Sequence, residues 1–275
     1  MINIRKLMLG SVELKTLRKL PALVLFAFLI MSTPLTSMSE DTVPTDNEGF
    51  LHYFSRTLPI NLLIGTQNSV TGWNLAILGV GAGTAITLSQ TDADKEVQNS
   101  LEGSLGNFAE IGNIGGNALA IAGVTVTSYI VAKQIKDEKF LQTSEALIES
   151  EIITAVMTEG LKVSVGRKRP NGDNNRFSSS FPSGHVSASF ALATTFDSMY
   201  GYKVGIPLYV FSSFVGLSRI SDNKHFLSDV LFGAALGTAV GRGVASIHKN
   251  GKKNRFSIMP YSDGTITGLA LALSW

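Results

Sequence analysis

Long apolar stretches with few charges dominate the middle and the carboxyl half of this chain of 275 residues. Their length, and the absence of strict alternation along them, predict helices rather than strands. A further stretch interleaves glutamates with apolar residues, as an amphipathic helix does. We therefore expect an all-α fold, a helical bundle of about six helices, at residues 73–88, 114–133, 144–162, 185–200, 206–217 and 226–247.

Residues 251–275 follow a different pattern. Larger residues alternate with smaller ones along residues 265–275, and Ser262, Asp263 and Gly264 form a typical hairpin-turn sequence before them. An alternating strand that ends in an aromatic residue is also a feature of outer-membrane barrel strands, but one hairpin cannot close a barrel. We expect a C-terminal β-hairpin packed on the helical body.

The amino end has the pattern of an export signal. Positive residues precede a short apolar run at residues 22–31, and small polar residues follow it. The run is short for a membrane span and typical of a signal peptide, although an uncleaved anchor or a buried helix would share the pattern. The expected organisation is a signal peptide at 1–39, an extension at 40–72, a helical domain at 73–250 and the hairpin tail at 251–275.

Composition excludes several classes of function. The net charge is only +2, and charged residues make up 16% of the chain, with no basic stripe interleaved with aromatic residues. This argues against a nucleic-acid partner. The chain contains no cysteine, which excludes disulfides and thiolate metal sites.

Three short segments combine into one pattern with chemical meaning. Residues 162–170 read K-x6-RP, residues 182–185 read PSGH, and residues 218–229 read SR-x5-H-x3-D. Alone, each would more often be a surface charge run, a helix cap or an exposed helix pair. In this order and spacing, the chain resembles the type 2 phosphatidic acid phosphatase superfamily at every fixed position. That superfamily also contains bacterial class A acid phosphatases and vanadium haloperoxidases.

Basic residues of these segments suit a transferring phosphoryl group, whose charge spreads over three oxygens. Lys162, Arg169 and Arg219 supply three fixed cations, and no carboxylate cluster at metal-ligand spacing accompanies them. PSGH predicts a helix start, where unpaired N–H groups near Ser183 and Gly184 bind an anion. We therefore expect a phosphate site without a metal.

Two histidines complete the predicted chemistry. His225 and Asp229 are four residues apart, so on a helix they share one face. A carboxylate that holds one ring nitrogen leaves the other free to attack, which makes His225 the nucleophile and Asp229 its orienting residue. His185 then protonates the departing oxygen and activates water for the second step. The family resemblance implies the same roles.

The remaining basic residues match no fixed position. Arg167 and Lys168 fall at variable positions of the first segment, where we expect them to set the local field or lie on the surface. His52 and His248 are expected to be structural or exposed.

Cellular location depends on whether the helices cross a membrane. Lys203 and Arg219 enclose about 15 residues and Asp229 and Arg242 about 12, whereas a span needs about 20. These charges favour an exported helical domain in the bacterial periplasm, either free or membrane-associated at its surface. The alternative is an integral inner-membrane protein.

The predicted function is a metal-independent phosphatase that hydrolyses a phosphomonoester through a phosphohistidine intermediate. The substrate would be a phosphorylated lipid or a small phosphoester; no cofactor is expected, and vanadate should inhibit as a phosphate mimic. The alternatives are a vanadium-dependent haloperoxidase, a phosphotransferase to an alcohol acceptor, and an outer-membrane structural module suggested by the tail alone. The pattern gives no oligomeric state.

Overall fold

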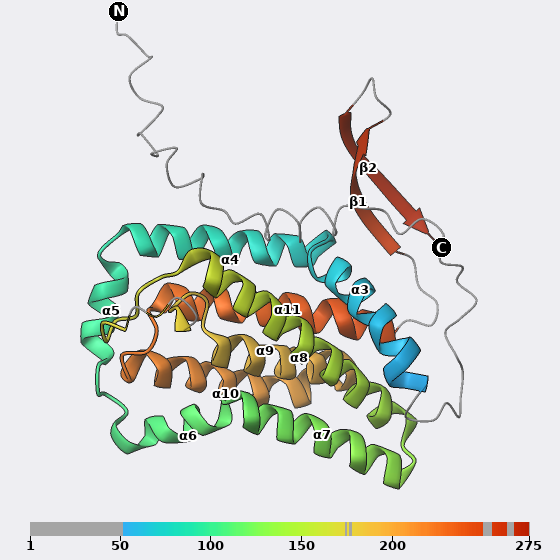
Figure 1. Ribbon diagram of the computed structural model, residues 1–275, viewed down its shortest axis with the longest axis horizontal. Coiled ribbons are helices and arrows are strands. Elements are labelled where there is room, and N and C mark those ends of the chain that lie inside the picture. The colour runs from blue at the N-terminus through green and yellow to red at the C-terminus, as the bar shows by residue number, and fades with distance from the viewer. Residues whose placement is uncertain (1–51, 174, 176–177, 250–254, 263–266, 275) are drawn as a thin grey trace, which may run out of the picture.

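The computed structural model describes residues 52–173, 175, 178–249, 255–262 and 267–274. Within these residues the body is built of helices (Figure 1), so the all-α prediction is confirmed. The helices are η3 (Tyr53–Thr57), α3 (Leu58–Ser69), α4 (Gly72–Gln90), α5 (Ala93–Leu101), η4 (Gly106–Phe108), α6 (Ala109–Gly115), α7 (Ala118–Ile135), α8 (Glu138–Val165), α9 (Gly184–Tyr200), α10 (Tyr202–Ser221) and α11 (Leu227–Lys249).

The described part contains nine α-helices rather than about six, because short elements escaped the periodicity argument. The expected helix at residues 114–133 is divided after Gly115, and Asn117 caps α7 by accepting a hydrogen bond from the Leu119 N–H. The segment at residues 91–102, where the sequence predicts no helix, contains α5. Part of the predicted extension, residues 58–69, forms α3, which packs against α8 and α11.

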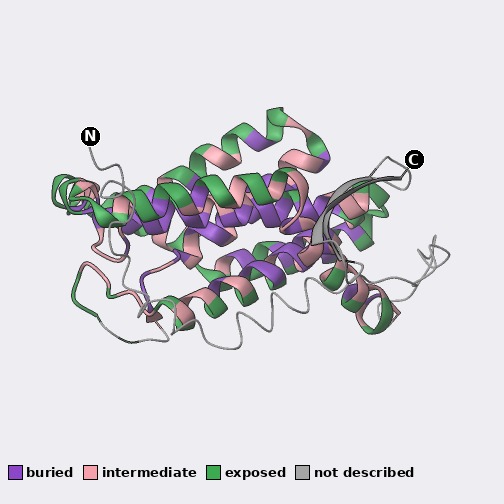
Figure 2. Ribbon diagram, turned by 90° about the horizontal axis from the view of Figure 1, so that it is seen from above, coloured by how far each residue is buried: buried purple, intermediate pink, exposed green. Residues whose placement is uncertain are grey.

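Helices α9 and α11 pack closely against each other. Buried residues gather on the inward-facing sides of the helices (Figure 2). Gly233, Gly237 and Gly241 line one face of α11 at four-residue intervals. A Cβ atom at Gly237 would lie 2.1 Å from the Ser187 carbonyl oxygen, so only glycine permits this approach. The contact fixes α11 against α9 and thereby relates the histidine segment before α11 to the helix start of α9.

Four helices of the described part are long and apolar enough to cross a membrane: α4, α7, α10 and α11. In α4 and α7 only 11% and 22% of the apolar window is buried within the protein. Large apolar side chains instead point outward, among them Trp73 at 81%, Val80 at 72% and Leu119 at 84% exposure. Such continuous apolar faces suit lipid rather than water.

The sequence argument for a water-soluble body relied on charges that divide the apolar segments. Lys203 and Arg219 lie in the first and last turns of α10, and Asp229 lies in the first turn of α11. Charges at helix ends do not prevent spanning, because the apolar windows of these helices remain long enough. The structure therefore favours the alternative of the sequence analysis, an integral membrane protein.

Beyond α11, β1 (Arg255–Ser262) and β2 (Thr267–Ser274) pair antiparallel, from Arg255 opposite Ser274 to Ser262 opposite Thr267. The predicted turn residues Asp263 and Gly264 lie outside the described residues, and the packing of the tail on the bundle stays a prediction. The signal peptide predicted at residues 1–39 also lies outside the described residues.

Candidate functional site

The three sequence segments meet at one end of the bundle. Helix α8 ends shortly after Lys162, because Gly166 adopts a left-handed φ of 61° and donates its N–H to the Lys162 carbonyl at 2.9 Å. The following loop returns to α9, where the Ser183 N–H donates to the Asp229 carbonyl at 3.1 Å. The residues brought together in this way are Lys162, Arg169, Ser183, Gly184, His185, Arg219, His225 and Asp229.

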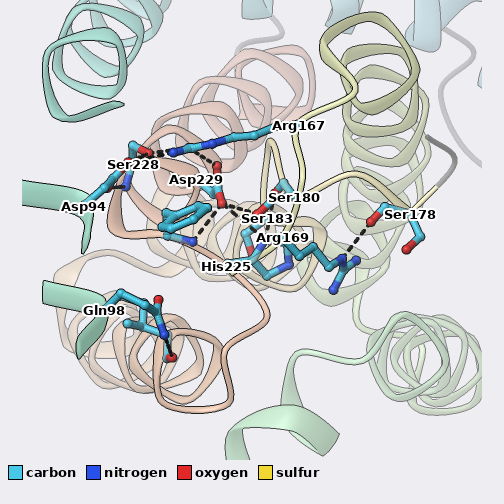
Figure 3. A network of polar contacts seen from close by, with 12 residues as sticks. Asp94, Gln98, Arg167, Arg169, Ser178, Ser180, Ser183, His225, Ser228 and Asp229 are labelled. Atoms are coloured by element: carbon cyan, nitrogen blue, oxygen red, sulfur yellow. Dashed lines mark hydrogen bonds and ion pairs between the residues drawn. The ribbon is translucent and has the colours of Figure 1, made fainter. Parts of the chain in front are cut away.

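His225 is almost fully buried, at 2% exposure, in the loop between α10 and α11. Its Nδ1 atom lies 2.7 Å from the Ser180 carbonyl oxygen (Figure 3). A carbonyl oxygen only accepts, so Nδ1 carries the proton and Nε2 keeps the lone pair. Burial lowers the pKa of His225, against the opposing effect of the nearby Asp229 carboxylate, so the ring is neutral and nucleophilic at neutral pH.

Asp229 does not hold His225 directly, contrary to the sequence argument. Its Oδ2 atom lies 3.8 Å from His225 Nδ1, which is too long for a hydrogen bond. The carboxylate instead accepts the Phe226 N–H at 2.8 Å, as a residue in the first turn of a helix can, and the Ser180 hydroxyl at 2.5 Å. Asp229 and His225 are therefore linked through Ser180, whose hydroxyl donates to Asp229 and whose carbonyl contacts His225.

His185, the second residue of α9, lies among the cations that the sequence predicted. Burial, and after it the neighbouring Arg219, His225, Lys162 and Arg169, lowers the pKa of His185 to about 3. The imidazole is therefore neutral until positive charge around it is offset. A bound phosphate dianion would supply that offset and favour the protonated form.

Each of the three cationic side chains makes a contact with a neighbouring oxygen atom of the protein. Lys162 Nζ lies 2.6 Å from Glu159 Oε1, and Arg169 Nε donates to the Ser178 carbonyl at 2.7 Å. Arg219 donates through one terminal nitrogen to the Asn113 amide oxygen, whereas its buried Nε atom has no hydrogen-bond partner among the described residues. A buried donor of this kind is available to an anion.

The start of α9 supplies the remaining donors. Ser183 is its N-cap residue, and the first N–H of the helix with a backbone partner within it belongs to Ser187. The buried Ser183 hydroxyl has no partner in the described part of the chain. A Cβ atom at Gly184 would lie 3.4 Å from Lys162 Nζ, an ordinary van der Waals contact, so the start of α9 lies directly beside the lysine. Together these groups form an anion cradle.

A polar pocket of about 340 Å³ opens beside His185 and Arg219. Its other lining residues come from α6 and the start of α7, and they include Glu110, Asn113 and Asn117. Of the predicted site residues, His185 and Arg219 line this pocket. Among the described residues, no group of three or more His, Asp or Glu side chains has the geometry to hold a metal ion.

Sequence reasoning missed three residues that support the site: Ser180, Arg167 and Asp94. Arg167 donates to the Asp229 carboxylate at 2.6 Å and to the Asp94 carboxylate at 2.8 Å. It had been assigned to the local field or the surface because its position in the segment is variable. Asp94 offered no signal at all, since it is far from every motif in the sequence.

The two histidines outside the motifs were expected to be structural or exposed. His248 is buried, with 7% of its side chain exposed, and its Nε2 atom lies 2.7 Å from Glu149 Oε2. This pair lies at the far end of α11 from His225. The structural expectation for His248 therefore agrees with its position.

Comparisons with known proteins cover the motif-bearing part. Residues 145–253 match the model of the PAP2 superfamily. The chain is 35% identical over 125 residues to lipid A 1-phosphatase of Porphyromonas gingivalis, covering 43% of this chain and 27% of that protein. It is 31% identical over 134 residues to lipid phosphate phosphatase 1 of Arabidopsis thaliana, covering 34% of this chain and 41% of that protein.

Both matches span less than half of the relatives' own length. Among solved structures, the chain aligns with the first transmembrane PAP2 type phosphatidylglycerolphosphate phosphatase from Bacillus subtilis. The alignment has a TM-score of 0.40 and 20% identity, and it covers 74% of this chain and 100% of that one.

Proposed function

We propose that this chain is a metal-independent lipid phosphate phosphatase of the PAP2 superfamily, whose model matches residues 145–253, and that it works through a phosphohistidine intermediate. One observation carries the proposal. A buried neutral histidine, His225, has its Nδ1 atom engaged by the Ser180 carbonyl and lies among the charges of Arg219 and Arg169. A free Nε2 atom beside an anion cradle is the arrangement that attack on phosphorus requires.

Binding is the first task of the site. Lys162, Arg169 and Arg219 neutralise the phosphoryl oxygens, and the Ser183 hydroxyl and the N–H groups at the start of α9 donate to them. Arg219 and Arg169 present planar forks that match the oxygens, whereas Lys162 acts as a point charge. This cluster takes the role that a magnesium ion has in other phosphoryl-transfer enzymes.

Transfer then proceeds in two steps. His185 first takes the proton that the phosphate monoanion of the substrate brings. His225 Nε2 then forms a bond to phosphorus while the bond to the alcohol oxygen breaks, and His185 donates this proton to that oxygen. In the second step neutral His185 takes a proton from water, the water oxygen attacks phosphorus, and the bond to His225 breaks. Inorganic phosphate leaves with the proton that His185 took from water, and both histidines return to their neutral starting states.

A lipid substrate is supported by the outer surface of the bundle. The apolar faces of α4 and α7 suit a bilayer, and the site lies at the helix ends, where phosphorylated headgroups are found. The Porphyromonas relative is named for removing the 1-phosphate of lipid A, and the Arabidopsis relative for acting on lipid phosphates. We extend to this chain only the shared chemistry, a phosphomonoester on a membrane lipid.

The proposed location is a bacterial inner membrane, with the site on the periplasmic side. The positive residues and apolar run of residues 1–39 support export of the segment that follows. We retain the signal peptide at residues 1–39 and the tail from residue 251 as part of the proposal, and we extend the helical domain to include α3. Extraction of membranes with alkaline carbonate tests the location, because an integral protein stays in the pellet and a peripheral protein is released.

A substrate panel tests the activity. Protein purified in detergent should release phosphate from phosphatidic acid or another lipid phosphate in the presence of EDTA. Vanadate should inhibit, and His225→Ala should remove the activity. Phosphate release that needs an added divalent metal, or equal release by His225→Ala, would contradict the proposal. Adding glycerol as an acceptor separates hydrolysis from transfer, because only transfer yields glycerol phosphate.

A further inference from the structure

Helix α5 lies outside residues 145–253, yet it contacts the centre of the site. We propose that Asp94, on α5, is a positioning residue for the proposed reaction: it anchors Arg167 and Ser228, which hold Asp229 and, through Ser180, the nucleophile His225. The inference rests on the proposed function for its chemistry and on the hydrogen bonds among Asp94, Arg167, Ser228 and Asp229 for its geometry (Figure 3).

Asp94 is buried, at 3% exposure, and its carboxylate is fully engaged. Its Oδ1 atom accepts the Ser228 N–H at 2.9 Å. Its Oδ2 atom accepts the Ser228 hydroxyl at 2.5 Å and Arg167 Nη2 at 2.8 Å. A buried carboxylate with three donors has one stable orientation, because any other would leave charge without compensation.

Arg167 transmits this orientation to the catalytic side. Its Nη1 atom donates to Asp229 Oδ1 and to the Ser228 hydroxyl, both at 2.6 Å. The guanidinium also lies 4.3 Å from the centre of the Phe226 ring, next to His225 in the chain. One planar fork is thus shared between two carboxylates, so the position of Asp229 depends on that of Asp94.

The last link is Ser180. Its hydroxyl donates to Asp229, and its carbonyl oxygen lies 2.7 Å from His225 Nδ1. Movement of Asp229 therefore moves the group that fixes the His225 tautomer. A tie elsewhere on α5 holds it to the same region, because the Gln98 amide donates to the Ile220 carbonyl at 2.8 Å. Asp94 is thereby fixed relative to the end of α10 as well as to α11.

If Asp94 had only a structural role, replacing it would lower the stability of the protein and leave turnover by the folded fraction unchanged. If Asp94 positions His225, replacing it should lower kcat and leave KM unchanged, because Asp94 contacts none of the phosphate-binding residues. The losses of kcat on replacing Asp94 and Arg167 should then be non-additive, since both residues act through the same contact with Asp229.

The test compares Asp94→Asn, Arg167→Lys and the double variant in purified, folded protein. Asp94→Asn keeps the shape and removes the charge. We expect kcat to fall by about 10²-fold, the scale of a misplaced reacting group, with KM within about twofold. The double variant should be no slower than the slower single variant. Glu149→Gln is the matched control, the same change at a carboxylate that is also buried but not linked to His225, and it should keep the wild-type kcat.

Unchanged kcat in Asp94→Asn, or multiplying losses in the double variant, would overturn the inference. If Asp94→Asn does not fold, Arg167→Lys still tests it, with unchanged kcat as the contrary result. A second readout is independent of turnover. The chain has four histidines, so ¹⁵N-histidine NMR can follow His225, assigned from the His225→Ala spectrum. Asp94→Asn should shift the tautomer signals of His225, and Glu149→Gln should not; unaltered signals would also count against it.

The failure of this inference is distinguishable from failure of the proposed function. If wild-type protein and His225→Ala release phosphate equally, the proposed function fails. If wild-type protein is active, His225→Ala is inactive and Asp94→Asn has the wild-type kcat, only the role of Asp94 fails.

Discussion

The two ends of α11 each lie beside a histidine paired with a buried carboxylate. Before its first turn, His225 Nδ1 lies 3.8 Å from Asp229 Oδ2. In its last turn, His248 Nε2 lies 2.7 Å from Glu149 Oε2. Both carboxylates have 0% exposure. By contact alone, the His248 pair is the tighter one, and it carries no motif.

The neighbours of each pair explain the difference. Glu149 also accepts from the Tyr53 hydroxyl and the Asn61 amide, so its donors are neutral side chains and a single histidine. Asp229 is held by Arg167. His225, next to it, lies near Arg219 and Arg169, two of the cations of the proposed phosphate site. A histidine–carboxylate pair therefore becomes reactive only where its carboxylate is satisfied by others and a free ring nitrogen faces positive charge.

Replacing each histidine in turn should give the largest difference in kcat between the two ends of α11. His225→Ala should lower kcat by about 10⁴-fold or more, because the attacking nitrogen is lost. His248→Ala should leave kcat within about twofold and lower the thermal midpoint, because Glu149 loses a buried partner. The measurements are steady-state phosphate release and thermal unfolding in detergent. A comparable loss of kcat in both variants would mean that the two ends are not distinct.

Arginine geometry gives the next largest effect. Arg219→Lys keeps the charge but loses the planar fork and the buried Nε donor, so we expect kcat/KM to fall by about 10²-fold. Arg242→Lys is the matched control on α11, outside the site, and should change kcat/KM by less than about twofold. If the two changes lower kcat/KM for lipid phosphate hydrolysis equally, Arg219 does not bind the phosphate.

The pH dependence of kcat/KM tests the role of His185. Its pKa of about 3 means that this group stays neutral as the pH falls until about 3, so it imposes no acid limb near neutral pH. The productive proton must arrive with the substrate, whose second phosphate ionisation has a pKa of about 6. We expect kcat/KM to fall tenfold per unit of pH above that value.

Substrates with different phosphate pKa values distinguish the two sources of the proton. The alkaline limb of kcat/KM should move with the substrate's own pKa. A limb that stays fixed across substrates would assign the titration to the enzyme and contradict this account of His185.

Removing the charge of Glu149, beside His248 at the end of α11, should have the smallest effect on turnover. Glu149→Gln should lower the free energy of unfolding by about 1–3 kcal/mol, because it disturbs the contacts with His248, Tyr53 and Asn61. Phosphate release by the folded protein should stay at the wild-type rate. A thermal midpoint equal to that of the wild type would show that this cluster contributes little to stability.

Local sequence predicted a set of residues that the fold brings close together, but not the residues that hold them in place. Lys162, His185 and His225 were predicted from the fixed spacings of the three segments. The Ser180 carbonyl beside His225 could not be found in this way, because every residue has a carbonyl and only the path of the loop selects one. Asp94 was missed for a related reason: its partners lie far away in the chain, and its own surroundings have the composition of a polar loop.

The sequence likewise predicted some elements of the fold and missed others. Apolar periodicity predicted the long helices, whereas α5 and α6 are too short for periodicity to detect. The sequence argument for a water-soluble body was weak, because charge spacing along a sequence does not show where each charge lies in the helices. Lys203 and Asp229 lie in helix ends, and Trp73 and Leu119 point outward.

Chemical trapping of the intermediate tests the central claim, that His225 is the nucleophile, most directly. Wild-type protein would be mixed with a lipid carrying a ³²P-labelled phosphate, quenched in alkali, and analysed for protein-bound label. We predict label that resists alkali and is lost in acid, as a phosphoramidate is, and that is absent from His225→Ala. Label that persists in His225→Ala, or label stable in acid, would contradict the account.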